Sequence, residues 1–338
     1  MGQDAFCCSL RCGPTSSDIV TTLREPIPVA GSGARLRALG RRGPSLQRRG
    51  RRFGIALIAP TAIVMALVIG FPIYYAVRMS LYTKSYLSPD ETFVGLENYT
   101  RVLTAPSFWS AAWNGVVYTV SSVTLQLVIG TAIAMALHRP FRGRGLARGL
   151  VLLPYVVPTV AAVAVWKWAL NDTFGIVNRV LLKLHLISSP VTWLSPHSMM
   201  AALIVLSIWM YTPFVIVSVL ARLQTMPVEI DEAARLDGAN GPRIFVYITL
   251  PQLMEVFGAV VLLRLYWMFT KFDLLWLVGE GGAAGRSIEN VPVYAFRRTF
   301  QELNSGEGAA AAVSLMLVLV AFSFVYLRAV PIERGSSE

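Results

Sequence analysis

Within the apolar part of this chain, a polar stretch runs from Met226 to Pro251 and gathers acidic side chains at close spacing. Its first part carries four carboxylates, those of Glu229, Asp231, Glu232 and Asp237. Ala233 and Ala234 lie among them, and such small side chains let another backbone approach closely. The chemistry of this segment therefore suits a close contact with another protein surface.

Local sequence signals predict two short helices joined by a tight turn in this stretch. The first helix should run from about Val228 to Leu236, and Gly238 then ends it, because glycine enters the left-handed conformation without a Cβ penalty. Asn240 offers a side-chain oxygen as the next N-cap, and Pro242 suits a first helical turn. The second helix should cover Arg243 to Leu250 and run into an apolar segment at Pro251.

This stretch resembles the EAA loop of ABC importer permeases. The matching residues are Glu232, Ala233, Ala234, Asp237, Gly238, Ala239, Phe245, Ile248, Leu250 and Pro251. In such permeases the loop is a coupling helix that docks in a cleft of the cytoplasmic ATPase subunit. The resemblance thus implies ATPase coupling by Glu232, Ala233, Ala234, Asp237, Gly238, Ala239, Leu250 and Pro251. An interfacial amphipathic helix with a glycine stop is the alternative.

No catalytic constellation accompanies this loop in the sequence. The phosphate-binding pattern GxxxxGK[ST] occurs nowhere, so any ATP hydrolysis, with its Mg²⁺, should belong to a partner chain. His138, His185 and His197 fall in loops that do not gather on one side. Cys7, Cys8 and Cys12 lack further ligands at zinc spacing. We therefore expect neither an enzyme nor a resident metal or cofactor.

Composition predicts an all-α integral membrane protein. Hydrophobic residues make up 55% of the 338, charged residues only 14%, and the mean hydropathy is +0.57. A helix needs about 20 mostly apolar residues to cross the hydrocarbon core. Six stretches qualify as spans: Phe53–Val77, Val116–Leu137, Leu150–Leu170, Met200–Ala221, Pro251–Val278 and Gly308–Val330. Prolines interrupt the third and fourth of them.

Lys and Arg in the loops set the expected orientation. The alternate segments that include the N-terminus carry far more of them than the other loops do. Both termini should therefore be cytoplasmic, with the loop 226–251 on the same side, between the fourth and fifth spans.

The domain organisation should be a permease domain at 53–330 between two cytoplasmic tails. Residues 1–52 hold most of the net charge of +11 and should form a disordered basic tail; residues 331–338 form a short second one. The basic tail can touch anionic lipid, and nucleic acid is not an expected partner. A start codon assigned too early would also explain the tail.

Other stretches resemble the carbohydrate branch of these permeases, in particular the maltose- or glycerophosphate-type first permease of a pair. They are Val165–Leu182, Trp193–Pro196, Ile208–Pro227, Phe269–Gly282 and Val293–Phe300. Aromatic platforms with a few polar groups suit sugars. The substrate-pathway candidates are Trp168, Trp209, Tyr211, Trp267, Phe272 and Asp273.

Three ionisable residues lie in or near the predicted spans. Lys271 and Asp273 are two positions apart, so a continuous helix would not place them on one face. Arg264 could snorkel to the interface or contact another helix.

The expected function is the transmembrane permease subunit of an ATP-driven importer in a bacterial or archaeal cytoplasmic membrane. The resemblance implies a second permease subunit, two ATPase subunits and an extracytoplasmic solute-binding protein as partners. The cargo would be a sugar, oligosaccharide, polyol or sugar-phosphate. A permease for peptide, phosphate or amino acid is the first alternative, and an ion-coupled secondary transporter is a more remote one.

Overall fold

The computed structural model describes residues 44–83, 91–279 and 283–329, with the side chains of 44–52 and 283–284 left out. The chain divides into two compact units, Met1–Ile69 and Gly70–Glu338. The division falls inside helix α1 (Pro44–Ser80), which begins within the stretch predicted to be a disordered tail. Pro44 is the first residue of α1, and a proline suits the first turn of a helix because its missing N–H would have no partner there. Residues 1–43 of the predicted tail 1–52, with all three cysteines, and the predicted tail 331–338 lie outside the described residues.

Five helical segments in the described part of the chain are long and apolar enough to cross a membrane. They are Phe53–Ser80 in α1; α3 (Pro106–His138); α7 (Met199–Thr225); Gly241–Phe269, which ends in α10 (Leu250–Phe269); and α13 (Ser305–Ala329). These correspond to five of the six predicted spans. The sixth exists only if the bent pair of helices described next is counted as one crossing.

The predicted span Leu150–Leu170, which two prolines interrupt, consists of two helices. These are α4 (Arg144–Val156) and α5 (Thr159–Ala169), and their axes differ by 96°. Val157 is extended because the ring of Pro158 disfavours helical geometry at the residue before it. Backbone that leaves the helix at membrane depth is tolerated where it is buried in protein or lines a cavity.

The predicted fifth span, Pro251–Val278, also ends early, at Phe269. The chain leaves the helix at Thr270 and starts a separate helix, α11 (Asp273–Gly279). Asn290 stabilises this break: its Nδ2 donates to the backbone oxygen of Lys271 at 2.7 Å, and its Oδ1 caps α12 (Val291–Phe296). Asn290 is far away in sequence, so the break follows from a tertiary contact.

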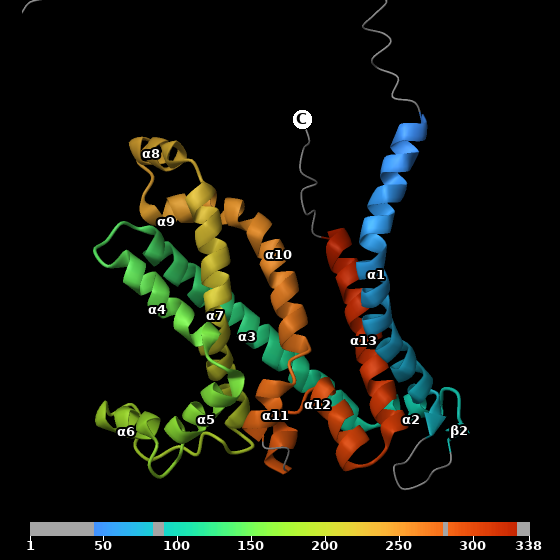
Figure 1. Cartoon of the computed structure of the whole chain (residues 1–338). Coiled ribbons are helices and arrows are strands. Elements are labelled where there is room, and N and C mark those ends of the chain that lie inside the picture. Colours follow the sequence, from blue (N-terminus) through green and yellow to red (C-terminus); the bar gives the residue numbers. More distant parts are fainter. Residues whose placement is uncertain (1–43, 84–90, 280–282, 330–338) are drawn as a thin grey trace, which may run out of the picture. The chain divides into compact units, whose positions relative to one another are not determined.

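Within the second unit, α3 and α7 pack along each other over much of their length, and α10 packs against both (Figure 1). Gly130 on α3 makes the approach possible, because a Cβ there would lie 2.8 Å from Cγ1 of Val215. Buried Leu203, Leu206 and Met268 form part of one core between these helices, and Val215, Val219 and Leu253 form part of a second.

A third core joins α13 to shorter elements of the same unit. They are the helices α2 (Glu97–Thr104) and α12, and the same core includes Phe108 and Ala111 at the start of α3. The short strand β1 (Tyr82–Thr83), which contacts α13, pairs antiparallel with β2 (Thr92–Phe93), with Tyr82 opposite Phe93. Ion pairs of Arg297 and Arg298, in the π-helical turn η3 (Arg297–Gln301), with Glu289, Glu302 and Glu307 add to this third core. Two further short elements are α6 (Ile176–Lys183) and a 3₁₀ turn, η2 (Ala283–Ser287).

Candidate coupling surface and central cavity

The acidic segment forms helix α8, and its bounds, Val228–Leu236, are those predicted from the sequence. Gly238 adopts φ +81°, as predicted. The N–H of Gly238 donates to the oxygen of Arg235 at 3.1 Å, and that of Ala239 donates to Ala234 at 2.9 Å. This pair of bonds is the Schellman motif, which satisfies the last carbonyls of a helix. The turn after α8 is therefore fixed by the local sequence.

The second helix of the loop is shorter than predicted. Asn240 Oδ1 accepts from the N–H of Arg243 at 3.1 Å, as expected for an N-cap, and α9 covers Gly241–Ile244. The predicted helix Arg243–Leu250 then widens into a π-helical turn, η1 (Phe245–Thr249). The wide turn lies directly before Pro251, whose ring would clash with the carbonyl four residues back in a regular α-helix.

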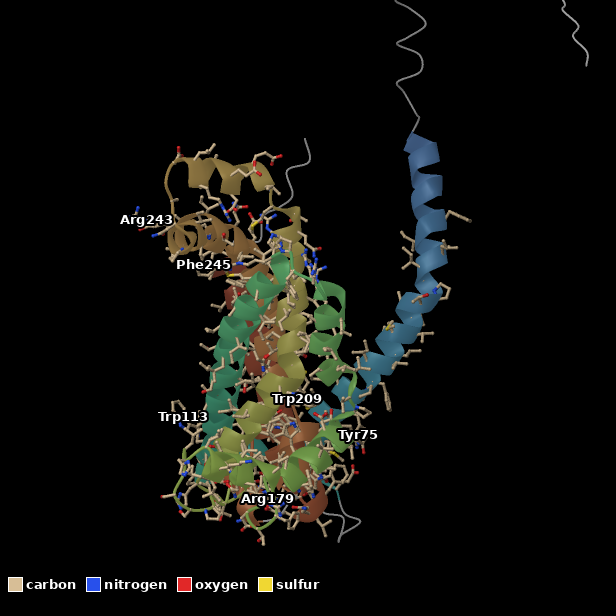
Figure 2. All side chains as sticks on the ribbon, turned by 90° about the vertical axis from the view of Figure 1, so that its left-hand side faces the viewer. Tyr75, Trp113, Arg179, Trp209, Arg243 and Phe245 are labelled. Carbon is tan, nitrogen blue, oxygen red and sulfur yellow. The ribbon has the colours of Figure 1, made fainter. Side chains whose placement is uncertain are left out.

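The predicted coupling residues differ in exposure. Glu232, Ala233, Asp237, Gly238 and Pro251 are exposed, and Ala234, Ala239 and Leu250 are half-buried. Leu236 is 90% exposed at the end of α8. We call the segment Met226–Pro251 the elbow from here on. Arg243 and Phe245 in the elbow lie near one end of the unit, whereas Arg179 and Trp113 lie near the other (Figure 2). The elbow thus exposes apolar side chains, Leu236 most of all, beside the carboxylates of Glu232 and Asp237.

Polar contacts join α7 to the first turns of α10, directly after the elbow. Arg222, near the end of α7, donates from Nε to the oxygen of Gln252 at 3.2 Å and pairs with Glu255 at 2.9 Å. Ile244 in the elbow and Leu253 on α10 are both buried. A cleft of about 220 Å³ between the elbow and the ends of α3 and α7 is lined by the inner face of α8, including Asp231 and Arg235. Glu232 and Ala233 do not line this cleft and are exposed on the other side of α8.

A larger cavity, of about 660 Å³, lies toward the far end of α10. We call it the central cavity. Its walls come from the break between α4 and α5, from α7, and from the break between α10 and α11. The lining residues are Tyr155, Val157, Thr159, Met210, Tyr211, Arg264, Trp267, Met268, Thr270, Lys271, Phe272 and Asp273. The two broken helices therefore meet at one hollow.

Four of the six substrate-pathway candidates line this cavity, namely Tyr211, Trp267, Phe272 and Asp273. Trp168 and Trp209 do not. Trp209 packs edge-on against Trp166 with ring centroids 5.9 Å apart, and Trp168 is 56% exposed. Sequence reasoning did not select Tyr155, Val157 or Thr159. The signal was present in the prolines at 154 and 158, because an interrupted membrane helix is suited to line a cavity.

The break after α10 brings Lys271 and Asp273 together, contrary to the prediction from a continuous helix. Their side chains pair at 3.1 Å, and the Lys271 ammonium also lies 4.9 Å from the ring centroid of Tyr211. Burial lowers the pKa of Lys271, but Tyr211 and Asp273 outweigh it and raise the pKa above its ordinary value. Lys271 is therefore a cation under physiological conditions.

Arg264 contacts a neighbouring helix and does not snorkel. It is 1% exposed, and its Nε and Nη2 donate to Oε1 of Gln126 on α3 at 3.0 and 2.5 Å. Tyr118 on α3 and Ser207 on α7 share a hydrogen bond of 2.7 Å in the same region. These polar contacts connect α3, α7 and α10 beside the cavity.

A model of the family described as "binding-protein-dependent transport system inner membrane component" matches residues 126–331. The chain is 36% identical over 262 residues to the inner membrane ABC transporter permease protein YcjO of Escherichia coli, covering 76% of this chain and 87% of that protein. It is 33% identical over 285 residues to the trehalose/maltose transport system permease protein MalF of Thermococcus litoralis, covering 84% and 95%. Its fold resembles a chain of a bacterial ABC transporter involved in the import of the acidic polysaccharide alginate, with TM-score 0.73, 18% identity and coverage of 84% and 97%.

Proposed function

The chain belongs to the family of binding-protein-dependent transport system inner membrane components, and from this premise we propose that it forms part of the translocation pathway of an ATP-driven sugar importer. The cargo is a sugar, oligosaccharide, polyol or sugar-phosphate. Relatives named for trehalose and maltose and for sulfoquinovosyl glycerol support this class of cargo. The protein is a multi-pass inner-membrane component, and we assign it to the cytoplasmic membrane of a bacterium or archaeon.

One observation carries the mechanical part of the proposal. The helical segment Gly241–Phe269 starts in the elbow and ends at the central cavity. Ile244 and Leu253 anchor its first turns, and Arg264, Trp267 and Met268 on its last turns line the cavity. A helix that is packed in a protein interior transmits displacement along its axis, because close-packed interiors resist continuous deformation. Movement of the elbow would therefore reach the groups that face the cargo.

The resemblance to importer permeases implies the partners, and the exposed side of the elbow supports a docking place for one of them. The outer face of α8, with Glu232, Ala233 and Leu236, would dock on a cytoplasmic ATPase subunit that binds ATP and Mg²⁺. A second, similar permease would complete the pathway above a pair of ATPase subunits, and an extracytoplasmic solute-binding protein would deliver the cargo. ATP and the loaded binding protein would both favour the outward-open state, because a ligand shifts an equilibrium only by its differential affinity for the two states.

The alternative functions fit these observations less well. A permease of the same superfamily for peptide, phosphate or amino acid would share the elbow but has no need of the aromatic lining at Trp267 and Phe272. An ion-coupled secondary transporter usually shows a pair of repeated halves. Phe53–Leu170 and Met200–Val330 share no such repeat in this sequence.

Reconstitution of the complete importer in proteoliposomes tests the proposal. We expect uptake of the cargo only with ATP inside and the loaded binding protein outside. Glu232→Gln should reduce uptake sharply, whereas the matched variant Glu97→Gln, on α2, should leave it unchanged, because the half-exposed Glu97 lies outside the elbow and pairs with Arg101 on its own helix. Uptake driven by an ion gradient without ATP would refute the proposal.

A further inference from the structure

The central cavity carries more positive than negative charge. Arg264 and Lys271 contribute two cations, and Asp273 contributes the carboxylate among the described residues that line it. Lys271 and Asp273 pair at 3.1 Å and so largely neutralise each other. The guanidinium of Arg264 therefore remains as the uncompensated charge.

Arg264 is held by uncharged groups. Gln126 accepts from its Nε and Nη2, and the ring centroid of Tyr211 lies 5.2 Å from its Cζ. No carboxylate of the described segments pairs with it, and its Nη1 donates to no acceptor there. An ionised group with 1% exposure is costly in a membrane protein unless it is paired. A buried arginine without a counter-ion at a cavity wall is therefore expected to have an anionic partner that arrives from outside the chain.

A second polar group at the same wall also lacks a partner. The hydroxyl of Tyr211 is buried and makes no hydrogen bond of normal geometry within the described part of the protein, although Lys271 and Thr159 are its polar neighbours. Its ring lies between the two cations, 5.2 Å from Arg264 Cζ and 4.9 Å from Lys271 Nζ. Buried hydroxyls are nearly always hydrogen-bonded, so an exception beside a cavity points to a ligand or water. Tyr211 and Arg264 thus offer unused donors at one place.

We propose that the central cavity takes a sugar that bears an anionic group, a carboxylate, sulfonate or phosphate, and that Arg264 is the residue that selects it. The planar guanidinium matches such groups in charge and geometry. Trp267 and Phe272 on the same walls provide apolar faces for the C–H surface of the sugar ring. This inference rests on the proposed function, since it specifies the cargo of the same pathway.

The test uses the complete importer in lipid nanodiscs, with glucose, glucuronate and inorganic sulfate as probes. Binding is followed by the fluorescence of Trp267, and Trp267→Phe identifies the part of the signal that comes from the cavity. We expect glucuronate to bind at least about tenfold more tightly than glucose. Glucose lacks one charge-assisted hydrogen bond, and such a bond typically changes the affinity by this factor. Sulfate should bind more weakly than glucuronate because it lacks the sugar ring.

Arg264→Gln should remove the preference for glucuronate while glucose binding persists, and Arg264→Lys should restore part of it because it keeps the charge. Arg179→Gln is the matched control, since Arg179 is exposed on α6 and does not line the cavity. Assembly of each variant is checked by its ATPase activity, so a misfolded variant is recognised.

Equal binding of glucose and glucuronate by the unaltered importer, or a preference that survives Arg264→Gln, would overturn the charge inference alone. Sulfate binding as tightly as glucuronate would overturn the sugar requirement. Failure of an assembled importer to bind any of the sugars would contradict both this inference and the proposed function.

Discussion

Arg264 on α10 and Gln126 on α3 form a buried pair in which one side-chain oxygen accepts two N–H groups, at 3.0 and 2.5 Å. The two residues come from helices separated by more than a hundred positions in the chain. Gln126 is itself fully buried. The pair fixes the end of α10 beside the central cavity, so its chemistry affects both stability and cargo selection.

Gln126→Leu should destabilise the importer. It leaves the Arg264 guanidinium buried without an acceptor, and losing such a partner costs roughly 2–4 kcal/mol. We expect a lower midpoint of thermal unfolding in detergent. Gln126→Glu should keep the midpoint, because a carboxylate accepts the same two bonds, yet it should weaken glucuronate binding by neutralising Arg264. A Glu variant that keeps the preference for glucuronate would contradict this account.

Gly130→Ala should loosen the contact between α3 and α7. The added Cβ would meet Val215 at 2.8 Å, and overpacking of this kind costs roughly 1–3 kcal/mol. Val215→Ala in the same chain should recover part of the loss, which a double-mutant cycle of unfolding midpoints measures. Gly145→Ala on α4 is the control, since nothing lies within 4 Å of a Cβ there. Additive effects of Gly130→Ala and Val215→Ala would show that the two positions do not share a contact.

Gly238→Ala should impair the elbow without affecting insertion into the membrane. Gly238 has φ +81°, and a side chain with a Cβ in that region costs about 1–2 kcal/mol. Gly238→Asn should be milder, because Asn enters this region more readily. We expect uptake to fall in the order Gly, Asn, Ala while the protein level in the membrane stays constant. Gly241→Ala, whose φ is not positive, should transport normally.

Lys271→Met should lower the midpoint of thermal unfolding of the importer by the same amount at about pH 6 and about pH 9. Both values lie in the range in which an ordinary lysine stays charged. The folded-state pKa of Lys271 is raised, so its stabilising contribution is complete below the unfolded value and is lost only as pH rises through the folded value. Thermal unfolding midpoints of both forms at the two pH values check this. A difference between them that shrinks at about pH 9 would contradict a raised pKa.

The elbow was predictable because its determinants are local. Gly238 and Asn240 fix its geometry by capping bonds to residues three positions away in the chain. A local sequence pattern was therefore enough to predict it. The π-helical turn before Pro251 was not anticipated, although a proline at that place disturbs the preceding turn.

The central cavity was predictable only in part, because helix ends within the membrane depend on distant residues. Asn290 satisfies the backbone at Lys271, and no local pattern shows this contact. The prediction of an unbroken span to Val278 therefore failed, and with it the separation of Lys271 from Asp273. Trp168 and Trp209 were selected for their residue type alone, and hydropathy does not tell which side of a membrane helix faces a cavity.

Cross-linking from the elbow in whole membranes tests the central claim most directly. A single cysteine replaces Ala233, in a chain whose Cys7, Cys8 and Cys12 are changed to serine, and the membranes are treated with a short bifunctional thiol reagent. The account predicts that the ATPase subunit of the importer is captured, that ATP changes the yield, and that a cysteine at exposed Arg179 on α6 captures none. Capture of the ATPase from position 179 and not from position 233, or labelling of position 233 from outside intact cells, would contradict it.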